Sequence, residues 1–554
     1  MEDTYDYVIV GAGSAGCVLA NRLTEDPDTS VLLLEAGGVD PFWEWTIRMP
    51  AALAYPMNGK RYNWDYHTEP EPHLGGRVMH CPGGKVLGGS SSINGMVYIR
   101  GNALDYDRWA AQDESLSEWD YQHCLPYFIK AESREGGGDD YHGSAGPLKV
   151  TRGRGENPLC GAFTKAAEEA GYPYTSDMNG YQQEGFGPMD RTTGGGIRHS
   201  TAVAYLRPAM RRANLTVLTR ADARRLILQG KQVTGLAFTR KRQTRKVFAN
   251  KDVILSGGPI NSPKLLMLSG IGPTEHIKET GITPTHALPG VGQNLQDHLE
   301  IYLQIACTQP VSLFKYYNLF GKAWVGARWL LTRTGLGASN SFEAGGFIRS
   351  RAGVIHPDIQ YHFFPMAVRY DGKSPNNSHG FQAHVGPMRS RSKGFVKLRS
   401  ADPNDDPKIC FNYMSLPEDW EEFRAAVRHT REIFAQAALA PYSGVELSPG
   451  PKVQSDEDLD RFLKGAVESA YHPSCTCKMG SDEMSVVDSE CKVRGLNGLR
   501  IVDSSIMPSI VSGNLNAPTI MIAEKAADII AGKTPLEPSN APVFVAQNFR
   551  DKQR

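Results

Sequence analysis

The stretch YDYVIVGAGSAGCVLANRL, residues 5–23, decides the fold. It opens with a compact apolar run, which is typical of a strand buried in a parallel sheet. A GxGxxG segment follows directly, and apolar residues from Ala15 to Leu23 then recur at helical spacing. A second apolar run, VLLLE at 31–35, comes next. The sequence therefore predicts a βαβ unit of the kind that binds dinucleotides.

The GAGSAG segment has one glycine for each of three tasks. Gly11 makes the tight turn, Gly13 lets the backbone approach a pyrophosphate, and Gly16 lets helix and strand pack closely. Glu35 ends the second strand, where a carboxylate can accept hydrogen bonds from ribose hydroxyls. An acid there argues against a 2′-phosphate and leaves FAD or NAD as the dinucleotide.

Length and charge exclude several other classes of protein. A chain of 554 residues is too long for one compact core, so two domains are expected. Lys+Arg and Asp+Glu are balanced at 60 each, which gives no electrostatic reason to expect nucleic-acid binding. No apolar run approaches the roughly 18–20 residues of a membrane span. The beginning of the sequence lacks a signal or transit segment, and the chain is expected to be intracellular.

The elements along the chain indicate a discontinuous cofactor domain. The sequence predicts an α/β fold, α+β overall, in which a Rossmann-like domain carries an inserted substrate domain. Segments such as FEAGGFIRS, DIQYHFF, GFQAHVGPM and GFVKLRS are typical of antiparallel strands with one exposed face. The cofactor domain is predicted over 1–155, 195–305 and 460–540, and the substrate domain over 156–194 and 306–459, followed by a C-terminal tail at 541–554.

Two further glycine-rich segments favour FAD over NAD. They are GGKVLGGSSSINGMVYIRG at 83–101 and GPINSPKLLMLSGIG at 258–272. Together with GAGSAG, they resemble the signature patterns of the glucose–methanol–choline (GMC) oxidoreductase family. The resemblance runs from about residue 5 to 532, and it is greatest to choline-oxidising members, through segments such as LPGVGQNLQDHLEIYLQ and YHPSCTCKMG.

This resemblance implies a reaction and a set of partners. It implies oxidation of choline to betaine aldehyde, a step of glycine betaine synthesis, by hydride transfer to flavin N5; the alternative is a GMC dehydrogenase or oxidase for another primary alcohol. The implied electron acceptor is a quinone or a respiratory-chain component rather than NAD or oxygen. The implied location is peripheral, on the cytoplasmic face of the inner membrane, or on the mitochondrial inner membrane in a eukaryote.

The resemblance also assigns roles to individual residues. His472 is the catalytic base facing the flavin, and Asn514 is its partner. Glu300 faces the substrate ammonium, with Tyr471, Phe342 and His362 lining the pocket. Weaker candidates for the aromatic cage are Tyr55, Trp64, Tyr66 and Phe364. The residues placed around FAD are Gly11, Gly13, Ser14, Ala15, Gly16, Glu35, Ala36, Gly88, Gly89, Asn94, Gly95, Met96, Val97, Ala223, Asp503, Asn516 and Thr519.

Two departures from the family pattern affect these expectations. Relatives that attach FAD covalently carry a histidine just before the loop asparagine Asn94, where this chain has Ile93. Noncovalent FAD is therefore implied. Many relatives also have an arginine where this chain has Gly84.

The chemistry suits these residue types. A histidine, with an ordinary pKa of about 6.5, can accept the hydroxyl proton at neutral pH. A quaternary ammonium cannot donate ordinary hydrogen bonds, so its site should combine a carboxylate with aromatic faces. Cys475 and Cys477 lack the CxxC spacing and the second ligand pair of a zinc site, so no metal is expected. The nine cysteines are odd in number and scattered, which predicts reduced thiols.

Two other classes of function stay open at this point. A reductase taking electrons from NAD(P)H would usually show a second GxGxxG unit and a redox CxxxxC, and this chain has neither. A flavin-binding module without activity would not need the pair of His472 and Asn514.

Overall fold

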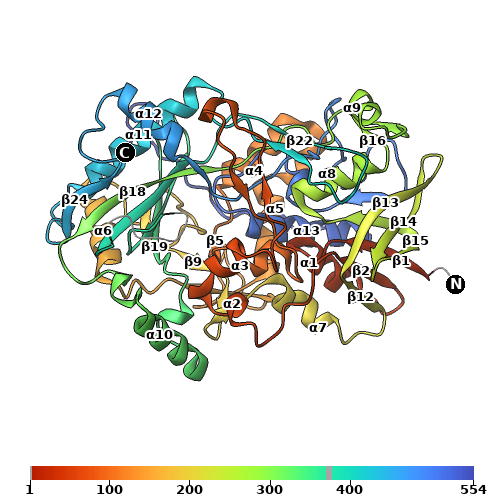
Figure 1. Ribbon diagram of the computed structural model, residues 1–554, viewed down its shortest axis with the longest axis horizontal. Helices are drawn as coiled ribbons and strands as arrows, with labels where there is room; N and C mark the ends of the chain where they lie inside the picture. The colour runs from red at the N-terminus through yellow and green to blue at the C-terminus, as the bar shows by residue number, and fades with distance from the viewer. Residues whose placement is uncertain (1–2, 370–376) are drawn as a thin grey trace.

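The computed structural model describes residues 3–369 and 377–554, and it contains two large sheets (Figure 1). The first is a mixed seven-stranded sheet in which β12, β2, β1, β15 and β26 run parallel. Two antiparallel neighbours, β14 and β13, extend it. Its strands, in order, are β12 (Leu215–Thr219), β2 (Val31–Glu35), β1 (Asp3–Val10), β15 (Gln243–Leu255), β14 (Gln232–Arg240) and β13 (Ala221–Gln229), with β26 (Leu499–Ile501) beside β15.

This first sheet confirms the predicted Rossmann-like α/β unit. The strand β2 is buried along its whole length, as a central parallel strand should be. Helix α1 (Ser14–Leu23) follows β1 and packs against α13 (Asn516–Ile530), which is almost entirely buried. The first and last parts of the chain thus share one hydrophobic core. Figure 1 shows α1 and α13 next to each other near the middle of the molecule, beside the strands of this sheet.

The second sheet is wholly antiparallel, which confirms the predicted substrate-domain architecture. Its order is β24 (Ser443–Ser448), β18 (Leu299–Cys307), β21 (Gly380–Pro387), β20 (Ile359–Phe364), β19 (Ala344–Ile348) and β8 (Gly185–Pro188), with β25 (Glu468–Ser469) beside β18.

The prediction that these middle strands expose one face was wrong. The strands β19, β20 and β21 are buried on both faces. One face packs against α6 (Pro158–Glu169) and α11 (Pro417–Phe434), and the other lines an internal cavity. The segment GFVKLRS forms the antiparallel strand that was predicted, β22 (Phe395–Lys397), but it pairs with β23 (Lys408–Cys410) in a ribbon apart from this sheet.

The predicted domain boundaries stay a prediction, but one strand crosses a boundary and another pairs across one. The boundary at 305 falls inside β18, and β25 pairs with β18 although it lies in the range 460–540. As a result, the loop that carries His472 follows directly after β25 of the substrate sheet, and the chain after this loop returns to the Rossmann-like sheet at β26. The C-terminal tail lacks strands and α-helices and packs on the surface, with Val543 against the main core. Within the described residues, none of the helices is long and apolar enough to span a bilayer.

Candidate active site

A cavity of about 1430 Å³ lies between the two sheets and reaches from the GAGSAG turn to the strands of the substrate sheet. The residues predicted around FAD line it, except for Gly16 and Gly88. His472, Asn514 and the four residues predicted to contact substrate line it as well. The structure thus gathers residues from across the chain around one space, and their individual roles stay predictions.

The GAGSAG turn and the backbone segments packed on it form one end of the cavity, which we call the cradle. Its glycines are required because these backbone segments pack closely together. Gly11 has a φ of +102°, and a Cβ there would lie 2.4 Å from the carbonyl oxygen of Ser256. A Cβ on Gly16 would lie 1.9 Å from the carbonyl oxygen of Gly11. Gly16 therefore acts behind the cavity, by letting α1 approach β1, which is the packing role predicted for the third glycine.

Gly84 is explained by the same kind of contact. A Cβ at Gly84 would lie 2.1 Å from the carbonyl carbon of Gly89, and a Cβ at Gly89 would lie 2.6 Å from the Cα of Gly13. Three backbone segments are therefore stacked at van der Waals distance at this edge of the cavity. An arginine in place of Gly84 does not fit this backbone.

The polar groups of the cradle fit a dinucleotide. The hydroxyl of Ser256 is buried without a hydrogen-bond partner among the described residues, and it lines the cavity. The hydroxyl of Ser14 donates to Asn516 Oδ1 at 2.8 Å, which joins the first residues of α1 and α13. Two helix N-termini therefore meet where negative phosphates would be stabilised.

Glu35 sits at the end of β2, where the ribose was expected. Its carboxylate accepts backbone N–H groups of Ala12 at 2.9 Å and Gly37 at 2.7 Å. Burial raises the pKa of Glu35 to about 7, against the lowering effect of these two hydrogen bonds. The geometry holds a carboxyl group in place to receive a hydroxyl from a bound nucleotide.

His472 is held at the other end of the cavity by its own backbone. The preceding residue, Tyr471, has a φ of +64°, which is uncommon outside glycine and turns the chain sharply. The backbone N–H of His472 donates to Asp297 Oδ1 at 2.7 Å. The second oxygen of Asp297 accepts the hydroxyls of Ser469 and Tyr413 at 2.5 and 2.6 Å. This buried aspartate therefore fixes the strained loop.

The ring nitrogens of His472 have different partners, which determines its tautomer. His298 Nε2 lies 2.9 Å from the carbonyl oxygen of Met388, so it must be the donor. A neutral His298 then accepts at Nδ1, which lies 3.0 Å from Nδ1 of His472. The proton of His472 consequently resides on Nδ1, and its Nε2 is a lone-pair acceptor facing the Nδ2 of Asn514 at 3.0 Å.

The electrostatic surroundings keep these histidines neutral. Burial lowers the pKa of His472 well below its usual range, and the neighbouring His298 and His362 lower it further. Burial likewise lowers the pKa of His298 to about 4 and that of His362 to about 4. Neutral His472 with its lone pair at Nε2 is the form that a proton acceptor requires.

Asn514 is oriented by donors on the substrate sheet. Its Oδ1 lies 3.2 Å from Nε2 of Gln360 and 3.4 Å from Nε2 of His362. With the oxygen occupied there, its amide N–H groups point to His472 and the cavity. The pair predicted from the resemblance therefore lies together on one wall of the cavity, and each of its two side chains is positioned by other side chains.

Glu300 belongs to a hydrogen-bonded chain across β18 and β21. Gln382 Oε1 accepts Nε2 of Gln304 and the backbone N–H of Val368, both at 2.8 Å. The amide nitrogen of Gln382 therefore donates to His384 Nε2 at 2.7 Å. His384 in turn donates from Nδ1 to Glu300 Oε1 at 3.1 Å. This relay orients the Glu300 carboxylate beside the cavity through a neutral donor.

Aromatic rings surround this carboxylate. Phe342 lies 5.2 Å from His384 and 5.1 Å from Phe364, measured between ring centroids. Tyr471 and Trp64 line the same cavity. Tyr66 does not line it, so its inclusion as a cage residue was wrong: it is buried, and its hydroxyl donates to Asn261 at 2.8 Å.

Sequence reasoning missed four residues of the site, namely Asp297, His298, Gln382 and His384. The first two stand three and two positions before Glu300 in the segment DHLE, and an acid next to a histidine was a signal that could have been followed. The other two come from a strand more than 80 positions away. Only the pairing of β18 with β21 brings them to Glu300.

The cysteines near His472 are packed in the core. All nine cysteines are free thiols, and Cys475 and Cys477 are completely buried. Burial raises the pKa of the Cys475 thiol to about 12, so it is neither a nucleophile nor an available ligand.

We expect these thiols to be unreactive in the native protein. Only Cys307 is more than slightly exposed, so a water-soluble disulfide reagent should modify at most one thiol quickly and all nine after denaturation. The absorbance of the released thiolate measures both stages. Rapid native modification of Cys475 or Cys477, located by peptide mass spectrometry, would contradict the packing described.

Comparison with known proteins adds to this geometry. The sequence matches the GMC oxidoreductase family over residues 5–300 and again over residues 390–523. A protein of Ectopseudomonas mendocina (strain ymp) named oxygen-dependent choline dehydrogenase is 56% identical over 550 residues, covering 99% of this chain and 97% of the relative. A protein of the same name in Stenotrophomonas maltophilia (strain K279a) is 57% identical over 546 residues, covering 98% and 97%.

Solved structures agree with the fold. Pyridoxine 4-oxidase from Mesorbium loti superposes with a TM-score of 0.87 at 32% identity, covering 96% of this chain and 100% of that chain. A formate oxidase variant from Aspergillus oryzae RIB40 superposes with a TM-score of 0.88 at 26% identity, covering 96% and 98%.

Proposed function

Because the chain belongs to the GMC oxidoreductase family, we propose that it oxidises choline to betaine aldehyde with noncovalently held FAD. The observation that carries the proposal is one cavity that holds a dinucleotide cradle, a neutral histidine–asparagine pair and a carboxylate ringed by aromatic side chains. Relatives named choline dehydrogenase, matched over nearly the whole chain, support the substrate. Ile93 at the position of the covalent histidine supports noncovalent attachment.

The cradle residues would hold the cofactor at two points. The N-termini of α1 and α13 would receive the phosphates, and Glu35 would accept a ribose hydroxyl. When bound, FAD supplies the acceptor for the hydride that leaves the alcohol carbon.

The protein's own residues accept the proton and position the substrate. Neutral His472 accepts the hydroxyl proton at Nε2, and the amide of Asn514 donates to the same oxygen as negative charge develops. Glu300 attracts the ammonium at the far end, and Phe342 and Tyr471 offer ring faces to its methyl groups. The substrate is thereby held at both ends, which positions its reacting carbon.

The experiment that tests this proposal uses the purified holoenzyme without oxygen. Addition of choline should bleach the flavin absorbance, and betaine aldehyde should appear in an amount equal to the flavin. Acid precipitation should release the flavin into the supernatant if it is held noncovalently. Bleaching by other primary alcohols but not by choline would overturn the substrate assignment.

The electron acceptor and the location remain proposals. We propose a quinone or another respiratory-chain component as acceptor, with the protein peripheral on the membrane that contains it. The name of the relatives, oxygen-dependent choline dehydrogenase, gives the competing possibility, which is oxygen. Reoxidation of the bleached enzyme by a soluble quinone analogue and by air, compared in one stopped-flow series, discriminates between the two: faster reoxidation by air would contradict the quinone assignment.

A further inference from the structure

Helix α10 (Leu319–Thr332) exposes an apolar stripe that the proposed chemistry does not use. The side chains of Phe320, Trp324 and Leu331 are 90%, 64% and 84% exposed. They are spaced i, i+4 and i+11, so they share one face of the helix. Figure 1 shows α10 at the periphery of the molecule, on the side of the substrate sheet. An apolar stripe directed outward in this way is typical of a surface that binds a membrane or another protein.

The opposite face of α10 belongs to the wall of the cavity. Trp329 is buried with Met49 and Ala52, and its indole N–H donates to the carbonyl oxygen of Gly196 at 2.7 Å. Gly326 and Leu330 line the cavity itself. The helix therefore separates the reaction cavity from the outside, with its buried face fixed to the body and its apolar stripe facing away.

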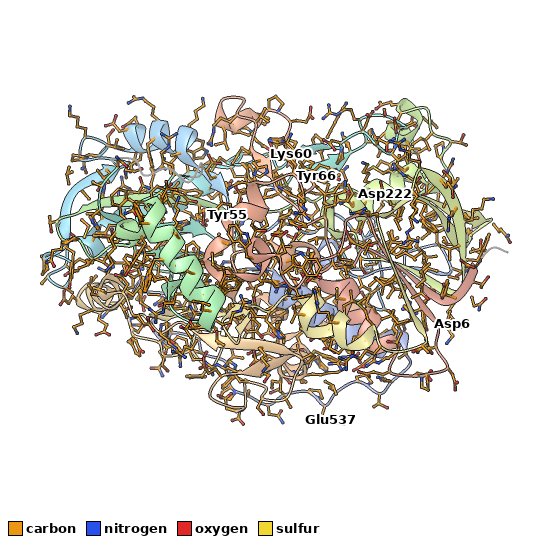
Figure 2. All side chains as sticks on the ribbon, turned by 60° about the horizontal axis from the view of Figure 1, so that its bottom comes forward. Asp6, Tyr55, Lys60, Tyr66, Asp222 and Glu537 are labelled. Carbon is orange, nitrogen blue, oxygen red and sulfur yellow. The ribbon has the colours of Figure 1, made fainter. Side chains whose placement is uncertain are left out.

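Two exposed aromatic residues from the N-terminal part of the chain lie on the cavity wall to which α10 also contributes. Trp45 of α2 (Trp45–Arg48) and Tyr55 of α3 (Ala54–Asn58) line the same cavity as α10, and their rings are 5.3 Å apart. Both are largely exposed. Figure 2 shows Tyr55 beside α10. Exposed aromatic residues at the edge of an apolar surface are typical of proteins that sit at a lipid–water interface.

The charges around the stripe select one kind of partner. Residues 301–342 contain no aspartate or glutamate, but they include Lys315, Lys322, Arg328 and Arg333. A helix with Trp, Phe and Leu on one face and only basic charges beside them is typical of binding to anionic lipid. A second copy of the chain offering this same surface would instead bring like charges together.

We propose that the outer face of α10 docks the protein on the surface of an anionic lipid bilayer, with the adjoining wall of the cavity directed toward the lipid. This proposal names the surface through which the proposed peripheral location would be achieved. Binding to lipid does not itself depend on the proposed function. Its benefit to the enzyme does rest on that function, because an electron acceptor dissolved in lipid would then meet the cavity. The stripe of Phe320, Trp324 and Leu331 would enter the headgroup region, and Lys315 and Arg328 would contact the phosphates.

Flotation of the holoenzyme with vesicles tests the proposal directly. Vesicles of equal parts phosphatidylcholine and phosphatidylglycerol should carry the wild-type protein at low salt, and less of it at high salt, because salt screens the basic charges. A triple variant, Phe320→Ser, Trp324→Ser and Leu331→Ser, should bind about tenfold or more weakly. A double variant, Lys315→Gln and Arg328→Gln, should lose about tenfold on these vesicles and much less on pure phosphatidylcholine.

Controls separate docking from folding and from catalysis. Met484→Ser removes an exposed apolar side chain on a loop outside α10 and should leave vesicle binding unchanged. All variants should oxidise choline with a soluble dye at wild-type rates, because the changed side chains do not line the cavity. Failure of choline to bleach the flavin would remove the proposed function and leave the vesicle result standing.

Two outcomes would overturn the docking proposal. One is a wild-type holoenzyme that does not float with the anionic vesicles while it turns over choline normally. The other is a triple variant that floats like the wild type but changes from dimer to monomer by light scattering, which would assign the stripe to an interface between copies of the chain.

Discussion

Replacing Glu300 with glutamine is expected to lower kcat/KM for choline by about thirtyfold or more, mainly through KM. The carboxylate lines the cavity and is only 12% exposed at its side chain, so its attraction for a quaternary ammonium is weakly screened. Truncating one partner of a buried charge pair typically costs about 2–5 kcal/mol. Glutamine keeps the size and can still accept the Nδ1–H of His384, so the change removes charge rather than shape.

The specificity of this effect can be measured with an uncharged substrate. The alcohol in which carbon replaces the quaternary nitrogen has the same shape as choline, and its kcat/KM should change by less than about threefold. Glu468→Gln is the matched control, because Glu468 pairs with Glu300 across the strands, is bound to Arg77 and does not line the cavity. Equal losses with both substrates would refute charge recognition by Glu300.

The sequence predicted those parts of the fold that depend on local spacing. The turn from Gly11 to Gly16 needs only consecutive residues, and its strand, helix and second strand form where the pattern placed them. Such features are encoded by neighbours along the chain, so one sequence is enough to find them. The pair of His472 and Asn514, by contrast, was implied by the family resemblance, and the structure brings the two side chains to 3.0 Å.

The relay behind Glu300 could not be found in this way. Glu300, Tyr302 and Gln304 alternate along β18, and Gln382 and His384 alternate along β21. These two sets meet because Tyr302 pairs with His384 and Gln304 with Gln382. That register depends on how distant strands pair, which alternation within each strand does not specify.

Alternation also misled the prediction of exposed faces. In β19, β20 and β21, the alternating pattern was interpreted as one exposed face. Both faces are buried, because one meets helices and the other meets the cavity. Polar and apolar residues alternate in the same way on a cavity wall and on a solvent-exposed surface. The sequence pattern therefore does not reveal that both faces of these strands are buried.

Replacing His472 with alanine is expected to lower kcat for choline by about 10²–10⁴-fold while FAD remains bound. General base catalysis contributes about this much, and the variant removes the only lone pair that faces Asn514 at 3.0 Å in the described structure. The cofactor should stay because the substitution leaves Gly11, Glu35 and the hydrogen bond between Ser14 and Asn516 in place. Single-turnover bleaching of the flavin measures the loss directly, and the flavin-to-protein absorbance ratio measures cofactor content.

A histidine far from the cavity provides the comparison. His286 lies 2.9 Å from the carbonyl oxygen of Arg494 and does not line the cavity, so His286→Gln should leave kcat unchanged. His298→Ala removes the acceptor that holds the proton of His472 on Nδ1, and it should lower kcat with little change in KM. Near-normal turnover of His472→Ala would show that the proton leaves choline by another route. A normal rate for His298→Ala alone would retain His472 as the base and show that its tautomer does not depend on that contact.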